Sequence, residues 1–366
     1  MTKLHQEIRF ATSADGARIA YAQSGRGYPL VRTAHWMTHV QWDWQTPVWG
    51  PWIEALSAHW RLLRYDSRGC GLSDRDTPAL ALDDLVHDLE AVVDAAGLER
   101  FALLGMSQGG AIAIAYAARH PQRVSQLVLC DGFARGALRR GAASIAPQMI
   151  DALCCLIEGG WGQENPAFRQ LFTSQFFPRA DAAQAEAFND LQRLSCSPTH
   201  ASRWLRAGGE IDATTELAQV RCPTLVMHGR GDARVPFDEG RFIAAGIVGA
   251  RFELLDTDNH VPLAGEAAFD AAHTLLRGFL PGADAGIDPA FMALTPRERE
   301  LLDLVARGLD NMQIAARLGR AEKTVRNNVS ALFATLQVES RAQAIVRARE
   351  AGFGKASDES GLRSRD

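Results

Sequence analysis

An apolar run that enters a Gly-x-Ser-x-Gly turn constrains this chain more than any other stretch. Residues 101–106 read as a strand, Ser107 stands at the apex between Gly105 and Gly109, and an Ala-rich helical pattern runs on to His120. A nucleophilic serine on a sharp strand-to-helix turn has a strained backbone, and a Cβ two residues before or after it would collide with the opposite limb. The alternative is a Gly/Ser-rich loop without chemistry. The strand, both glycines and the helix together favour a serine nucleophile, with a helix N-terminus facing the oxyanion that forms.

Strand and helix patterns alternate through the first 280 residues. Residues 7–24 predict a hairpin around Asp15-Gly16, and Leu and Val recur at helical spacing over 82–97. Further strands are expected at 30–34, 60–65, 101–106, 127–130, 224–227 and 251–255. This alternation is typical of a doubly wound, mostly parallel α/β sheet, whose ligands bind at the carboxyl ends of the strands. Residues 135–210 are helix-rich instead and are expected to form a cap over those ends.

The 366 residues predict one large domain and one small one. Residues 281–290 contain Pro, Asp and small residues without periodicity, so we expect a linker there between a domain at 1–280 and a helical module at 291–353. Residues 354–366 are polar and expected to be disordered.

The composition fits a soluble protein with a sizeable core, since 47% of the residues are hydrophobic and 22% are charged. The N-terminus lacks a signal-peptide pattern and no stretch approaches a membrane span. The six cysteines are scattered without the spacing of metal ligands. The sequence therefore predicts a cytoplasmic protein without a metal, a cofactor or a membrane partner.

Two late loops supply the partners that a serine nucleophile needs. Acyl transfer requires a base for the serine proton and an acid that orients the base. Asp232 follows the strand expected at 224–227, and His260 follows the strand expected at 251–255. We therefore predict a triad of Ser107, His260 and Asp232. Asp131 is the rival acid, because it follows the strand next to that of the nucleophile.

In these motifs, residues 5–280 resemble the α/β-hydrolase superfamily. The resemblance rests on the hairpin, the Asp-x-Arg-Gly loop, the serine turn, the cap and the late Asp and His in this order. It implies that the oxyanion is bound by the backbone N–H groups of Gln108 and Met37. The family usually has His-Gly where this chain has His35-Trp36, and Trp does not adopt glycine-only backbone angles. The resemblance therefore implies a differently shaped loop here and slow hydrolysis.

Six of the eight tryptophans fall between residues 36 and 60. Such rings often line an apolar ligand pocket. Ordinary core packing explains the cluster equally well. We expect His35, Trp36 and Trp42 to be pocket residues.

The C-terminal module differs from the rest of the chain in charge. Residues 291–366 hold 13 Lys and Arg against 10 Asp and Glu, a net charge of +3 within a chain of net charge −4. Four helices are expected at 296–307, 311–318, 322–336 and 341–351. Thr295, Pro296 and Glu298 form a capping box that begins the first helix. A helix, a Gly-containing turn and a longer polar helix are typical of a helix-turn-helix.

These helices resemble the LuxR-type (GerE-like) DNA-binding domain, through the segments 294–298, 314–318, 322–327 and 342–346. The resemblance implies base contacts by Arg326, Asn327 and Ser330. It also implies phosphate contacts by Lys323, Thr324 and Arg341. Ala321, Asn328 and Thr335 depart from the family pattern, and a four-helix interaction module that does not bind DNA is the alternative.

Together the two resemblances predict a transcription regulator. Its α/β-hydrolase domain would sense, and perform slow hydrolysis of, a small apolar ester- or lactone-like ligand. Its LuxR-type domain would bind double-stranded operator DNA as a homodimer, because such modules read paired half-sites. Two alternatives stay open: a working serine esterase with an incidental DNA-binding tail, and a receptor that has lost catalysis.

Overall fold

The computed structural model describes residues 5–77, 80–141, 144–282, 294–336, 338, 340–350 and 353–354. It divides into two compact units, Met1–Leu280 and Pro281–Asp366. The linker expected at 281–290 and the tail expected at 354–366 lie almost wholly outside the described residues.

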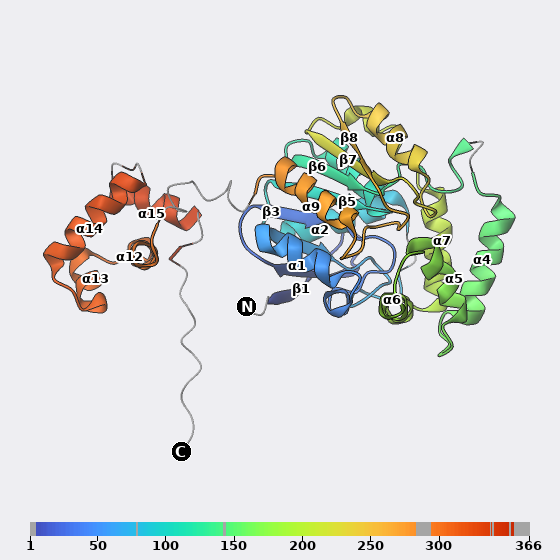
Figure 1. The fold of residues 1–366 in the computed structure, drawn as a ribbon, viewed down its shortest axis with the longest axis horizontal. Helices are drawn as coiled ribbons and strands as arrows, with labels where there is room; N and C mark the ends of the chain where they lie inside the picture. Colours follow the sequence, from blue (N-terminus) through green and yellow to red (C-terminus); the bar gives the residue numbers. More distant parts are fainter. Residues whose placement is uncertain are drawn as a thin grey trace, which may run out of the picture. The chain divides into compact units, whose positions relative to one another are not determined.

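An eight-stranded, mostly parallel sheet forms the centre of the first unit (Figure 1). The strands follow the order β1-β2-β4-β3-β5-β6-β7-β8. The pairs β1–β2 and β2–β4 are antiparallel and the other pairs are parallel. The strands are β1 (Gln6–Thr12), β2 (Arg18–Ser24), β3 (Pro29–Arg32), β4 (Arg61–Tyr65), β5 (Phe101–Met106), β6 (Val124–Cys130), β7 (Thr224–Gly229) and β8 (Arg251–Leu255). The predicted α/β architecture is confirmed.

Burial along the strands explains their sequence patterns. All six residues of β5 are buried, which is why this strand reads as one apolar run. β1 lies at the edge of the sheet and is largely accessible. It pairs with β2 as the expected hairpin, with Phe10 opposite Ala20 across the turn at Asp15-Gly16.

Helices connect and cover the strands. They are α1 (Gly50–His59), α2 (Leu82–Ala95), α3 (Gly109–Arg119), α8 (Phe237–Gly246) and α9 (Ala267–Phe279), with 3-10 turns η1 (Asp43–Gln45) and η3 (Leu217–Gln219). α2 buries Leu85, Leu89 and Val92, the residues whose spacing predicts it. α1 and α9 lie side by side (Figure 1), and the rings of Trp52 and Phe269 join them, with centroids 5.3 Å apart.

Four helices between β6 and β7 form a separate layer at one end of the sheet (Figure 1). They are α4 (Pro147–Gly160), α5 (Ala167–Phe176), α6 (Ala182–Ser195) and α7 (Pro198–Glu210). Local capping defines their starts: Asp181 and Gln184 form a capping box at α6, and the Ser197 hydroxyl accepts the His200 N–H at α7. These helices lie within the segment expected to form the cap.

The second unit contains α12 (Pro296–Ala306), α13 (Asn311–Leu318), α14 (Glu322–Thr335) and α15 (Arg341–Glu350). Thr295 begins α12 with the expected capping box to Glu298, and α13 ends at Gly319 in the left-handed conformation (φ 61°). The helices share an apolar core that includes Leu302, Val305, Ile314, Val329 and Leu332. No helix among the described residues of the chain is long and apolar enough to cross a membrane.

Candidate functional site

Ser107 lies where β5 ends and α3 begins, in the strained conformation expected of a nucleophile on a sharp turn. Its φ is +51°, which is uncommon for a residue with a Cβ. A Cβ on Gly105 would lie 2.8 Å from the Gly109 carbonyl oxygen, across the turn. A Cβ on Gly109 would instead lie 2.3 Å from Thr33 Oγ1, at the end of β3. Both positions therefore require glycine, but the second glycine is required by the neighbouring strand and not by the opposite limb.

The loops after β7 and β8 bring Asp232 and His260 together. His260 Nδ1 lies 2.8 Å from Asp232 Oδ2, and both side chains are almost fully buried. His260 Nε2 is buried without a hydrogen-bond partner among the described residues. No described hydrogen bond joins His260 to Ser107. The imidazole thus has one nitrogen fixed by a carboxylate and the other available to take a proton.

Asp131, the rival acid, makes other contacts. Its Oδ1 accepts the Gly229 backbone N–H at 2.6 Å, and its Oδ2 lies 3.2 Å from Cys130 Sγ. Among the described residues, Asp131 makes no hydrogen bond to His260, and its own φ is +50°. The hydrogen-bond geometry therefore favours Asp232 as the partner of the imidazole.

The carboxyl groups of Asp232 and Asp131 differ in the direction of their pKa shifts. Burial acts to raise the pKa of Asp232, but the charge and hydrogen bond of His260, together with His228, hold that pKa well below its usual value. Burial raises the pKa of Asp131 to about 6, against the opposing charge of His228. Asp232 is therefore ionised at neutral pH in a site where its charge can stabilise an imidazolium.

Asp131, His228 and Asp232 also place possible metal-ligand atoms within 4.8 Å of one another. Each residue already uses at least one of its possible ligand atoms in a contact with the protein. His228 Nε2 lies 3.0 Å from the Val235 carbonyl oxygen, Asp131 bonds Gly229, and Asp232 bonds His260. We therefore interpret this cluster as a support for the His260–Asp232 pair and not as a metal centre.

The two residues expected to bind the oxyanion are Gln108 and Met37. Gln108 follows Ser107 directly and precedes α3, while Met37 lies in the loop after β3. Neither backbone N–H donates a hydrogen bond within the described residues. Met37 has φ +56°, whereas Trp36 does not take a positive φ. The Trp in place of the usual Gly therefore avoids left-handed strain, because the strained position of this loop is the next residue.

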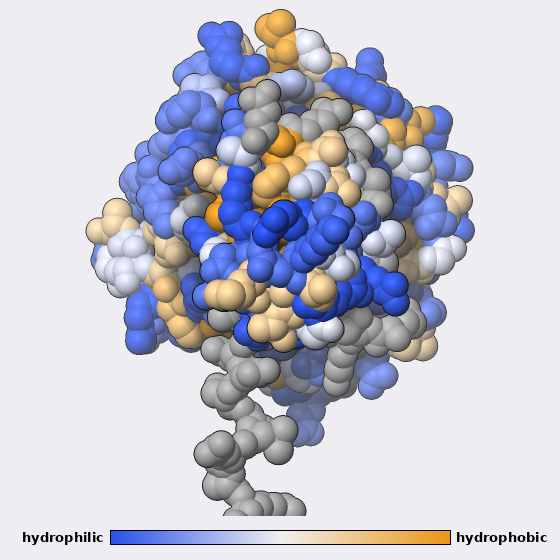
Figure 2. All heavy atoms as spheres, turned by 90° about the vertical axis from the view of Figure 1, so that its left-hand side faces the viewer, coloured by the Kyte–Doolittle hydropathy of each residue, from blue (hydrophilic) through white to orange (hydrophobic). Residues whose placement is uncertain are grey.

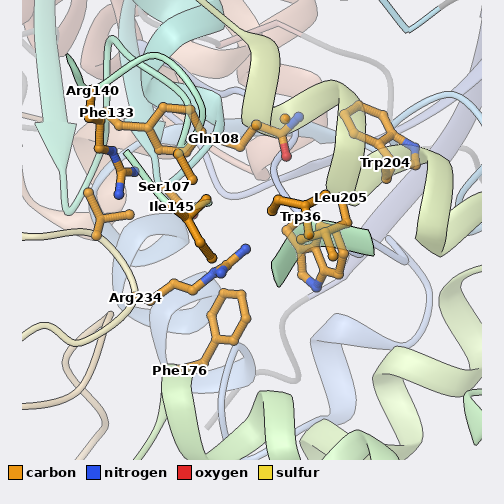
Figure 3. A pocket seen from close by; sticks show the side chains of 15 residues that line it. Trp36, Ser107, Gln108, Phe133, Arg140, Ile145, Phe176, Trp204, Leu205 and Arg234 are labelled. Carbon is orange, nitrogen blue, oxygen red and sulfur yellow. The ribbon is translucent and has the colours of Figure 1, made fainter. Parts of the chain in front are cut away.

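A pocket opens onto Ser107 beneath the cap (Figure 3). It is lined by Trp36, Ser107, Gln108, Phe133, Ala137, Arg140, Ile145, Ile150, Phe176, Trp204, Leu205, Gly208, Gly209, Arg234 and Val235. Most of these side chains are apolar, and they come from the core loops and from α4, α5 and α7. Two arginines interrupt the apolar wall.

Of the three pocket residues expected from the sequence, only Trp36 lines this pocket. His35 is buried behind it, with its ring 4.6 Å from that of Trp49, and burial together with the charge of Arg32 lowers its pKa to about 3. Trp42 is 38% exposed at the start of η1 and is not a lining residue. The tryptophan cluster divides between the pocket wall, with Trp36, and core packing, with Trp52 and Trp60 fully buried.

The cap contacts the loop that carries His260 directly. The backbone N–H of His260 donates to the carbonyl of Phe176, the last residue of α5, at 2.7 Å. Their rings also meet edge to face with centroids 5.3 Å apart. Phe176, Arg140 and Arg234 lay outside the sequence prediction, because irregular loops and the end of a cap helix bring them to the pocket.

In the second unit, five of the predicted DNA contacts share an exposed surface. Lys323, Thr324, Arg326, Asn327 and Ser330 are all exposed on α14. Arg326 also pairs with Glu322 at 2.8 Å, one turn earlier. Figure 2 looks from the side on which α13 and α14 lie in Figure 1 and shows hydrophilic side chains gathered there.

The sixth predicted contact, Arg341, is bound within the unit. Its guanidinium donates to the Leu309 carbonyl and, at 3.1 Å, to Asn311 Oδ1. The start of α14 also lacks a side-chain cap, since Ala321 stands at that position. The structure thus presents the predicted base contacts on one helix and uses Arg341 to tie α15 to the turn before α13.

Comparisons with known proteins agree with both units. The family described as alpha/beta hydrolase fold matches residues 42–149, and the luxR family of bacterial regulatory proteins matches residues 292–348. The chain is 30% identical to the AB hydrolase superfamily protein YisY of Bacillus subtilis over 61% of its own length and 81% of that protein.

Two solved structures share the fold of the first unit. A hydrolase from Pseudomonas aeruginosa PA01 has a TM-score of 0.61 and 26% identity, covering 75% of this chain and 98% of its own. The esterase RhEst1 from Rhodococcus sp. has a TM-score of 0.60 and 26% identity, covering 74% and 98%. This chain therefore belongs to the α/β-hydrolase superfamily and carries a LuxR-type DNA-binding domain at its C-terminus.

Proposed function

We propose that this protein is a transcription regulator whose hydrolase unit binds and hydrolyses a small ester or lactone, and whose LuxR-type unit binds operator DNA as a homodimer. The observation that carries the proposal is the buried His260–Asp232 pair, whose Nε2 has no partner among the described residues and whose imidazole packs against Phe176, a residue that lines the same pocket as the strained Ser107. The similarity to proteins named hydrolases and to an esterase supports ester chemistry.

The proposed reaction begins when Ser107 Oγ attacks the substrate carbonyl carbon and His260 Nε2 takes the hydroxyl proton. The Asp232 carboxylate stabilises the imidazolium, and the N–H groups of Gln108 and Met37 stabilise the oxyanion. His260 then gives the proton to the leaving oxygen. Water, deprotonated by His260, cleaves the acyl-enzyme, so the net reaction adds one water across the acyl C–O bond.

Ligand can change DNA binding only if it binds one conformation of the protein better than another. The contact between Phe176 of the cap and His260 supports a role for the cap in this coupling, because Phe176 also lines the pocket and a ligand there would touch the ring that packs against His260. A homodimer is part of the proposal because helix-turn-helix units read paired half-sites.

The test uses the full chain and two assays. Bound sequences are first selected from a random duplex library, and the affinity for a selected duplex is then measured by fluorescence anisotropy. The measurement is repeated with nitrophenyl esters of increasing acyl length, for the wild type and for Ser107→Ala. We expect Ser107-dependent ester turnover and a selected duplex whose affinity changes with ester.

The outcomes separate the alternatives. Turnover with no sequence-selective DNA binding would leave an esterase with an incidental tail. Ligand-dependent DNA binding without turnover, unchanged in Ser107→Ala, would leave a receptor that has lost catalysis. Either result would overturn part of the proposal.

A further inference from the structure

Two arginines line the pocket without a carboxylate partner. Neither side chain of Arg234 and Arg140 forms an ion pair with any described residue. The Arg234 guanidinium makes no described hydrogen bond, and its nearest recorded partner is the ring of Phe176, 5.2 Å from Cζ. Arg140 donates from Nε to the Arg135 carbonyl at 3.2 Å, which leaves its two terminal nitrogens without a described partner.

Three other arginines of this unit have carboxylate partners within the protein. Arg32 lies 3.2 Å from Asp43, and Arg68 lies 2.7 Å from Asp88. Arg135, close to the pocket arginines in sequence, lies 2.6 Å from Glu239. Arg234 and Arg140 are half-buried and lack such a carboxylate, so their charge is available to a ligand in the pocket.

The pocket itself supplies no anion. None of its lining residues is Asp or Glu. Asp232 is the nearest acid in sequence, but its Oδ2 bonds His260, and its Oδ1 accepts the backbone N–H groups of Arg234 and Val235 at 2.8 and 3.0 Å. Burial and the charge of Arg140 lower the pKa of Arg234 to about 10, against the opposing charge of Asp232, so this cation stays charged at neutral pH.

The two arginines are placed to meet a ligand. Figure 3 shows the Arg234 side chain running between Ile145 and Phe176 with its guanidinium directed into the pocket, and Arg140 beside Phe133. Ser107 is labelled between them in the same view. Trp36 and Leu205 form an apolar wall on the other side. A ligand that fills this space therefore meets cations and apolar surface together.

We propose that the substrate is an ester or lactone that carries a free carboxylate, which Arg234 and Arg140 bind while Ser107 attacks the acyl carbon. The proposal rests on the proposed hydrolase function for its reaction and on the unpaired arginines for its substrate class. A carboxylate accepts the planar fork of an arginine through two parallel hydrogen bonds. Hydrolysis then adds water to the acyl C–O bond and leaves a product with two carboxyl groups.

The test compares two esters that differ in one group. 4-Nitrophenyl hydrogen glutarate and 4-nitrophenyl valerate have acyl chains of the same length, and only the first ends in a carboxylate. We expect the wild type to favour the glutarate ester by about tenfold or more in kcat/KM, mainly through KM, because a hydrogen-bonded charge pair contributes about this much. Arg234→Gln and Arg140→Gln are each expected to abolish most of the preference, and Arg234→Lys to keep part of it.

Arg139→Gln is the matched control. Arg139 precedes Arg140 but is exposed and pairs with Glu210 at 2.7 Å. This variant is expected to keep the wild-type preference. A wild type that favours the valerate ester, or a preference that survives both Arg234→Gln and Arg140→Gln, would overturn the proposal.

Binding separates this proposal from the hydrolase function. Ser107→Ala is titrated with both esters by calorimetry, with and without Arg234→Gln. Arg234-dependent binding of the glutarate ester, together with no turnover of either ester by the wild type, would support the carboxylate site and reject hydrolysis. Turnover of the valerate ester without Arg234-dependent binding of the glutarate ester would support hydrolysis and reject the carboxylate site. Inorganic phosphate is added as a competitor for the arginine site. If it competes more strongly than glutarate, and does so through Arg234, the substrate group bound there is a phosphoryl group and not a carboxylate.

Discussion

The backbone N–H of Arg234 donates to Asp232 Oδ1 at 2.8 Å, so the carboxylate that binds His260 also fixes the residue whose guanidinium enters the pocket. One short loop after β7 thus carries both the proposed acid of the triad and the proposed binding group for substrate. A change at Asp232 is therefore expected to disturb catalysis and substrate binding together, whereas a change of the Arg234 side chain leaves the Asp232 backbone contacts in place.

Asp232→Asn tests which carboxylate serves His260. An amide cannot carry the charge that stabilises the imidazolium and can favour the wrong tautomer, so we expect kcat to fall by about 10³-fold or more. Asp131→Asn is the matched comparison and is expected to lower kcat by no more than about tenfold, because Asp131 bonds Gly229 and not His260. Ester kinetics of the two variants measure this. A larger loss in Asp131→Asn would make Asp131 the acid.

Asp131→Asn also tests the pH dependence of stability. Burial raises the pKa of Asp131 to about 6, so at pH 5 the native state holds a proton that the unfolded state has mostly released. The stability that Asp131 contributes to the wild type therefore falls as the pH rises from 5 to 7.5, and the variant lacks this contribution. We expect their difference in unfolding free energy to shift by about 1 kcal/mol in favour of the variant over that range.

Urea unfolding followed by tryptophan fluorescence measures this shift. All eight tryptophans lie between residues 36 and 204, so the signal reports the hydrolase unit alone. A shift of the opposite sign, or none, would contradict the assignment of a buried Asp131 with a raised pKa.

The sequence predicted the elements of the fold well because their signals are local. The apolar run of β5, the spacing of Leu85, Leu89 and Val92, and the capping box at Thr295 are each complete within a few residues. The order of Ser107, Asp232 and His260 along the chain was also enough to propose a triad.

The pocket could not be predicted in the same way, since its wall forms by tertiary contacts. Trp36 and Trp42 look equivalent in sequence, yet the turn at η1 leaves Trp42 38% exposed. Arg140 lies in the irregular segment between β6 and α4. Arg234 comes two residues after Asp232, but this spacing alone does not show that its guanidinium enters the pocket without an ion-pair partner. The positive φ of Met37 likewise depends on the whole loop after β3 and not on Trp36.

Ala321→Ser tests the start of the helix that carries the predicted DNA contacts. Ala321 is the N-cap of α14 and has no side-chain hydrogen bond, whereas a serine hydroxyl accepts an N–H of the first turn. We expect about 1 kcal/mol of added helix stability, seen as roughly fivefold slower amide exchange in α14. Thr295→Ala, which removes an existing cap, is expected to speed exchange in α12. Unchanged exchange in α14 with a clear effect in α12 would reject the capping argument.

Arg326 and Lys323 are expected to serve different parts of DNA recognition. Arg326→Ala should weaken binding to the selected duplex by about 1–3 kcal/mol and relax selectivity at one position. Lys323→Ala should weaken binding to all duplexes alike and reduce the salt slope by about 1. Arg341→Ala should act through loss of its bonds to Leu309 and Asn311, as faster amide exchange. Anisotropy titrations over a range of salt check the two expectations for DNA binding, and amide exchange checks the third. A lowered salt slope without faster exchange in Arg341→Ala would make it a phosphate contact.

The most direct measurement is the hydrolysis of nitrophenyl esters, including the glutarate and valerate pair, by the wild type and by Ser107→Ala purified in parallel. We expect turnover by the wild type and a loss of at least about 10³-fold in the variant. Equal, negligible rates in both proteins would contradict the central claim that Ser107 is the nucleophile of a working hydrolase.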